Sequence, residues 1–97
     1  MVKKRIFMTL QNSINIPDTL FAQVVDEEMV ILDSISQEYF GLDKTGAVIW
    51  QHLNEHGSLQ KTYDAMHEVY EVEDEQLEID ICRFVQELVD AGLVEVQ

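Results

Sequence analysis

The amino-acid sequence predicts an α+β domain resembling a winged helix-turn-helix, in which an N-terminal three-stranded antiparallel sheet is followed by three α-helices. Three observations predict this fold class. The chain has 97 residues, which is the size of one domain. Its apolar content of 46% is sufficient for a hydrophobic core. The spacing of the apolar residues changes once, near residue 43, from that of short strands to that of helices.

The strands are expected in the first half of the chain. Residues 1–18 show weak patterning and are predicted to be a loosely structured arm, so that a single domain covers residues 19–97. Three β-rich runs follow, at residues 20–25, 29–32 and 38–42, and polar segments of hairpin length join them. We therefore expect an antiparallel meander with the third run at one edge.

The first helix is predicted to span about residues 44–55. Asp43 or Thr45 can serve as its N-cap, and Gly57 is suited to the left-handed position that ends a helix. The spacing of its apolar residues places them on one face, which comprises Val48, Ile49, Trp50 and Leu53.

Two more helices are predicted in the second half. Ser58 can cap a helix over about residues 59–70, and Asp74 can cap a third helix that ends at Gly92. Residues 93–96 are expected to form a short last strand or an extended tail. The third helix has an apolar stripe at helical spacing, formed by Leu77, Ile81, Phe84, Val85 and Leu88.

The charge of the chain excludes one class of partner. Nineteen acidic residues against six Lys and Arg give a formal net charge of -13, which repels the phosphates of nucleic acid. No apolar run approaches the roughly 20 residues of a membrane-spanning helix, and the single Cys82 can form no internal disulfide. We expect a cytoplasmic protein that binds neither nucleic acid nor membranes.

No catalytic, cofactor or metal centre is predicted. His52 and His56 are four residues apart on the first helix and offer two metal ligands, but the pattern gives no convincing third, so we interpret them as surface histidines. Cys82 has no Lys, His or helix N-terminus beside it to favour a thiolate, so it is expected to be a packing thiol. The four glycines are dispersed and form no phosphate-binding loop.

Two segments of the sequence resemble a known family. These are Glu38-Tyr39-Phe40-Gly41-Leu42-Asp43-Lys44-Thr45-Gly46-Ala47-Val48-Ile49-Trp50 and Phe84-Val85-Gln86-Glu87-Leu88-Val89-Asp90-Ala91-Gly92-Leu93-Val94. Together they are similar to the PqqD-like family, named for the small chaperone of pyrroloquinoline quinone (PQQ) biosynthesis. The same module is called the recognition element of ribosomally synthesised and post-translationally modified peptides (RiPPs). The resemblance extends from about residue 20 to the end of the chain. Asp43 stands where many relatives carry Asn, and both residues cap helices well.

The resemblance implies a function. Members of this family are non-catalytic modules that hold the leader segment of a ribosomally made precursor peptide and present it to a modifying enzyme. That enzyme is commonly a radical-SAM protein, a cyclase or a leader protease. The free-standing chain resembles the discrete form of the module. The implied mechanism is strand addition, in which an extended leader pairs with the free edge of the third strand and lies against the third helix.

The candidate peptide-binding residues follow from the resemblance and from the pattern. On the third strand they are the backbone of Glu38, Tyr39, Phe40, Gly41 and Leu42. On the third helix, Cys82, Val85 and Val89 extend the apolar arc along one flank, which we interpret as a groove wall. Glu78 lies on the same side and can pair with a basic leader residue or a backbone amide.

Several alternatives stay open at this stage. Tyr39, Phe40, Leu42, Val85 and Val89 also suit a role in the core, and the pattern does not decide which side chains contact a leader. The edge strand can equally pair two copies into a homodimer. A second functional hypothesis is an acidic docking subunit of a biosynthetic enzyme complex that does not itself bind a precursor peptide.

Overall fold

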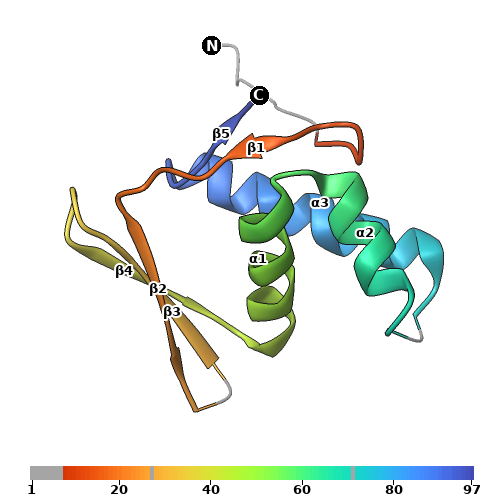
Figure 1. Ribbon diagram of the computed structural model, residues 1–97, viewed down its shortest axis with the longest axis horizontal. Helices are drawn as coiled ribbons and strands as arrows, with labels where there is room; N and C mark the ends of the chain where they lie inside the picture. Colours follow the sequence, from red (N-terminus) through yellow and green to blue (C-terminus); the bar gives the residue numbers. More distant parts are fainter. Residues whose placement is uncertain (1–7, 27, 71) are drawn as a thin grey trace, which may run out of the picture.

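The computed structural model describes residues 8–26, 28–70 and 72–97, and it confirms the α+β fold. A three-stranded antiparallel sheet lies at one side of three helices, and two short paired strands lie above them in the view of Figure 1. The elements are β1 (Ile14–Asn15), β2 (Leu20–Val25), β3 (Glu28–Asp33), β4 (Glu38–Leu42), α1 (Lys44–His56), α2 (Leu59–His67), α3 (Asp74–Asp90) and β5 (Glu95–Val96).

The main sheet has the order β2-β3-β4, so β4 is an edge strand as predicted. On its inner face Met29 and Ile31 of the central strand are buried. The register places these two residues opposite Leu42 and Phe40 of β4, which are partly buried against the same core. Because side chains alternate across a strand, Tyr39 of β4 faces the other side of the sheet, where it is exposed.

The predicted caps of the first two helices are confirmed. The Asp43 carboxylate accepts a hydrogen bond from the Gly46 amide at 2.8 Å, and the Ser58 hydroxyl accepts one from the Lys61 amide at 3.2 Å. Gly57 ends α1 with φ of 70°, a left-handed conformation that glycine adopts without strain. Gly57 and Ser58, which follow each other, explain the sharp turn between α1 and α2.

The ends of α2 and α3 differ from the prediction. The helix α2 ends at His67, three residues early, and Val69 is exposed instead of lying on the apolar face. Asp74 is the first residue of α3, so the N-cap position falls on Glu73, which makes no side-chain capping hydrogen bond, and the Asp74 carboxylate is bound to the His67 ring at 2.6 Å. At 17 residues α3 is the longest helix described, and no described helix is long and apolar enough to cross a membrane.

The core lies between the inner face of the sheet and the three helices. Trp50 and Leu53 of α1 and Leu59 of α2 are almost completely buried, as are Ile81 and Val85 of α3. The full set of buried apolar residues comprises Ile14, Met29, Ile31, Ala47, Ile49, Trp50, Leu53, Leu59, Met66, Leu77, Ile81, Val85, Leu88, Leu93 and Val94.

The described part of the expected arm, residues 8–18, is more ordered than the sequence indicates. Strand β1 pairs antiparallel with β5, so that Ile14 lies opposite Val96. Ile14 is 3% exposed, and its amide donates to the Gly57 carbonyl at 2.8 Å. Two-residue strands are too short to produce a readable alternation, which is why the pattern did not reveal them. Residues 1–7 of the arm lie outside the described residues.

Candidate functional site

The outer edge of β4 is the first component of the candidate site. Among the described residues β4 pairs only with β3, so one side of its backbone is left without a strand partner. An edge strand of this kind presents main-chain donors and acceptors to another polypeptide. The vacant edge that the sequence predicts at residues 38–42 is therefore present.

The hydrogen bonds of the neighbouring turn identify which backbone groups point outward. The Ser34 amide donates to the Thr19 carbonyl at 3.0 Å, toward β2, so the preceding residue, Asp33, directs its backbone groups toward β4. Asp33 is the register partner of Glu38. The N–H and C=O groups of Glu38 therefore point toward Asp33 on β3. Since this direction alternates from one residue to the next along a strand, the N–H and C=O groups of Tyr39 and Gly41 point away from the sheet.

A cleft between α1 and α3 is the second component. It has a volume of about 260 Å³ and adjoins the end of β4. A Cβ atom at Gly46 would lie 3.1 Å from Phe84 Cε1 and 3.6 Å from Leu42 Cβ, so this glycine lets the two helices and the strand approach closely. The complete lining comprises Asp43, Thr45, Gly46, Ile49, Asp80, Arg83, Phe84 and Glu87.

The cleft combines an apolar wall with a largely acidic rim. Phe84 is half-buried and packs against the core, and Ile49 is 2% exposed. The carboxylates of Asp43, Asp80 and Glu87 surround this wall, with Arg83 as the one basic side chain of the lining. Such a site suits an apolar side chain with a positive charge nearby.

The predicted residues on β4 lie together at the edge. Glu38 and Gly41 are exposed, and Tyr39 is 70% exposed on the outer face of the sheet. Phe40 and Leu42 are half-buried and turn toward the core, so their side chains serve packing while their backbones pair with β3.

The predicted residues on α3 do not join the cleft. Val85 is completely buried and therefore lines no surface groove, and Cys82 and Val89 are half-buried against the core. Glu78 is exposed, and its charge helps to raise the pKa of Tyr63 on α2, after the larger effects of partial burial and Asp74. The helical spacing of Glu78, Cys82 and Val89 places this flank on the opposite side of the buried stripe from the cleft.

Sequence reasoning missed the cleft residues of α3, which are Asp80, Arg83, Phe84 and Glu87. Phe84 belongs to the apolar stripe predicted for the third helix, and its ring does pack on the core while it also lines the cleft. Gly46 was the available signal, since a glycine at the first turn of a helix marks a close approach of another element.

Cys82 has an environment that suppresses nucleophilic chemistry. Partial burial, and to a smaller extent the Glu78 carboxylate, raise the pKa of the thiol. We expect iodoacetamide to alkylate Cys82 more slowly in the folded protein than in the same chain in urea, with the rate profile displaced to higher pH. Equal rates in the two states would contradict a thiol protected by the fold.

The same pKa shift gives a sign for the pH dependence of stability. Since the folded state holds the Cys82 proton more tightly than the unfolded chain, the free energy of unfolding falls as the pH rises above the ordinary thiol value of 9.0. Cys82→Ala should reduce this fall in urea titrations at a series of pH values. If the free energy of unfolding of Cys82→Ala fell equally steeply with pH, the pH dependence would come from other groups, such as Tyr63, whose pKa is also raised.

The outer face of the sheet carries a row of apolar side chains. Phe21, Leu32 and Tyr39 are register partners across the three strands, and Phe21 is 58% exposed. A hollow of about 420 Å³ lies at one end of this row, lined by Leu32, Ser34, Gln37 and Tyr39. The row lies on the outer face of the sheet, whereas the cleft lies between α1 and α3.

Comparison with known proteins relates this geometry to proteins that bind peptides. The chain is 32% identical to TbiB1, solved in complex with the TbiA(beta) leader peptide, with a TM-score of 0.75 over 82% of this chain and 93% of that one. It is 30% identical to a lasso peptide synthetase B1 complexed with the leader peptide, with a TM-score of 0.74 over 84% and 96% of the two chains. No curated protein is significantly similar in sequence. Residues 28–94 match the model of the coenzyme PQQ synthesis protein D family, and the chain therefore belongs to the PqqD family.

Proposed function

We propose that this protein is a non-catalytic module that binds the leader of a ribosomally synthesised precursor peptide and presents it to a modifying enzyme. The observation that carries the proposal is the open backbone of Tyr39 and Gly41 beside the cleft at Phe84. The similar structures of TbiB1 and the lasso peptide synthetase B1, both complexed with leader peptides, support it.

The leader binds as a fourth strand of the main sheet. Its main chain exchanges hydrogen bonds with Tyr39 and Gly41, which supply affinity with little dependence on sequence. Because side chains alternate along the added strand, one of them reaches the cleft between α1 and α3, where Ile49 and Phe84 form the wall. The backbone contacts set the register, and the cleft selects the anchoring side chain.

The acidic rim favours a leader with a basic residue beside the apolar anchor. We expect the double substitution Asp80→Asn and Glu87→Gln to weaken leader binding several-fold at low salt and to reduce its salt dependence. The matched control, Asp64→Asn with Glu75→Gln, removes the same charge from exposed positions outside the cleft. Equal weakening in both double variants would mean that net charge acts on the leader without any local recognition.

The modifying enzyme is expected to dock on the outer face of the sheet. The apolar row Phe21, Leu32 and Tyr39 is exposed there, on the side of β4 away from the helices. A radical-SAM protein, a cyclase or a leader protease is the expected class of enzyme. Such a partner can hold the module by this row while the leader occupies the edge and the cleft. We place this assembly in the cytoplasm, where the ribosome supplies the precursor.

The exposed row also favours a second candidate function, a docking subunit that recruits an enzyme without binding a precursor. A co-purification experiment with a candidate precursor and a candidate modifying enzyme distinguishes the two. Capture of the precursor by the isolated protein supports the peptide-binding module. Capture of the enzyme alone, with no heat of precursor binding in calorimetry, supports the docking subunit.

A second copy of the chain is a competing occupant of the β4 edge. Antiparallel pairing of two β4 strands would produce a symmetric dimer and close the leader site. Light scattering of the protein with and without leader tests this alternative. We expect a monomer that binds one leader. A dimer that dissociates when leader is added would instead show that the leader and a second copy of the chain compete for the same edge.

A further inference from the structure

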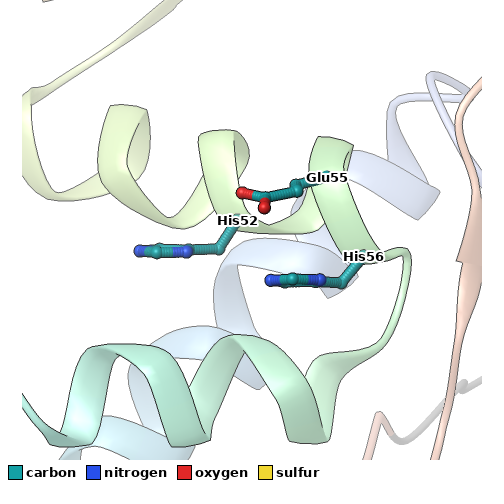
Figure 2. Close-up of side chains that lie close together, drawn as sticks. All are labelled: His52, Glu55 and His56. Atoms are coloured by element: carbon teal, nitrogen blue, oxygen red, sulfur yellow. The ribbon is translucent and has the colours of Figure 1, made fainter.

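The last two turns of α1 carry a cluster of metal-ligating side chains that lies outside the peptide site. The ligand atoms of His52, Glu55 and His56 all lie within 4.8 Å of one another. Figure 2 shows the two imidazole rings side by side, extending in the same direction from α1, with the Glu55 carboxylate near them. Their ring centroids are 6.4 Å apart and the ring planes differ by 7°.

The three side chains are available to a ligand. Among the described residues none of them has a hydrogen-bond or ion-pair partner, whereas the third histidine of the chain, His67, is bound to Asp74. His52 is half-buried and the other two side chains are exposed, so their torsion angles can adjust without disturbing the core. The sequence pattern identified the two histidines, and the fold brings Glu55 to them as a third donor.

The electrostatic surroundings favour a cation. The cluster ends at His56, the last residue of α1, where the carbonyl end of the helix dipole is negative. The chain as a whole has a net charge of -13, so a divalent cation is attracted to it at long range.

The donor set selects the class of metal. Two imidazole nitrogens with one carboxylate oxygen suit borderline divalent transition metals, whereas magnesium and calcium prefer oxygen ligands. In a tetrahedral zinc site the metal–ligand distances are about 2.0–2.2 Å, which puts neighbouring donor atoms about 3.4 Å apart. Rotation of the exposed side chains can close the remaining gap. Three protein ligands leave the fourth position for water.

We propose that His52, Glu55 and His56 form an open three-ligand site for a divalent transition metal such as zinc. The site is independent of leader binding. The ligand nearest to the cleft, His52, lies six residues beyond Gly46 on the same helix, or about 9 Å farther along its axis, and His56 lies ten residues beyond it, or about 15 Å. A metal bound there ties the last two turns of α1 together and stabilises the folded state without touching the cleft.

Calorimetric titration of the purified full chain with zinc chloride at neutral pH tests the proposal. We expect one zinc ion per chain, with affinity reduced at least tenfold in His52→Ala and in His56→Ala, and several-fold in Glu55→Gln. The matched control His67→Ala removes a histidine outside the cluster and should bind zinc like the wild type. Zinc should also raise the melting temperature of the wild type and of His67→Ala, but not that of the His52→Ala and His56→Ala variants.

Three outcomes would overturn the metal site. These are no saturable binding up to millimolar zinc, unchanged affinity in His52→Ala and His56→Ala, or loss of binding in His67→Ala. Leader affinity measured with zinc and with a chelator should be the same. A leader affinity that depends on zinc would refute the independence of the two sites, while the metal assignment itself is decided by the histidine variants.

Discussion

Replacing Gly41 by proline is expected to weaken leader binding by roughly ten- to a hundredfold. Proline removes the outward backbone donor at this position and places a ring at the edge where the leader pairs. Loss of one main-chain hydrogen bond, with its partner left unsatisfied, costs about 1–3 kcal/mol. Because the Gly41 backbone faces away from β3, the pairing within the sheet is retained. Titration calorimetry with the leader peptide measures the effect.

Two matched variants separate the lost donor from other effects of proline. Gly41→Ala keeps the amide, and its Cβ meets no atom within 4 Å, so wild-type affinity is expected. Ala22→Pro removes an outward amide from β2, the opposite edge of the sheet, and should leave leader affinity unchanged. Strand addition at β4 would be refuted if Gly41→Pro bound the leader normally while remaining folded by circular dichroism.

Replacing Phe84 by alanine is expected to weaken leader binding by about thirtyfold. The ring forms the apolar wall of the cleft, and truncation of an aromatic residue at the centre of an interface typically costs about 2 kcal/mol. Since Phe84 is also half-buried against the core, the variant should lose about 2 kcal/mol in the free energy of unfolding. Calorimetry for binding and urea titration for stability measure the two effects separately.

Phe21→Ala is the matched control for Phe84→Ala. It removes the same side chain from the outer face of β2, where the ring is 58% exposed. We expect Phe21→Ala to bind the leader normally and to lose the modifying enzyme, while Phe84→Ala does the reverse. Phe84→Leu keeps an apolar wall and should recover part of the leader affinity. If both alanine variants bound the leader equally well, the cleft would not be the anchoring site.

Local rules predicted most of the fold because the signals are local. Helix caps act through hydrogen bonds and backbone conformation within a few residues, as Asp43, Gly57 and Ser58 do here. The start and end of α1 could therefore be predicted to within one residue. The strand at 38–42 was predicted with the bounds found in the structure, since hairpin-length connections impose the neighbouring pairing. The edge position of β4 followed from this meander.

The rest depended on how elements far apart in sequence meet. The buried residues of α3, Leu77, Ile81, Val85 and Leu88, have Cys82 on one flank and Phe84 on the other, and helical periodicity cannot tell which flank faces α1 and β4. The packing of Gly46 against Phe84 decides this, and it placed the cleft on the side opposite to the predicted groove wall. In the same way, Ile14 pairs with Val96, a residue that is far away in the sequence. No local sequence pattern can predict such a pairing.

Amide hydrogen exchange of Tyr39 and Gly41, measured by NMR with and without the leader, tests the central claim most directly. The amides of these two residues face away from the sheet and should exchange rapidly in the free protein. On adding leader we predict strong protection at both positions, with no change at the outward amide of Ala22 on the opposite edge. Protection of Tyr39 and Gly41 already in the free monomer, or none after the leader has bound, would contradict strand addition at β4.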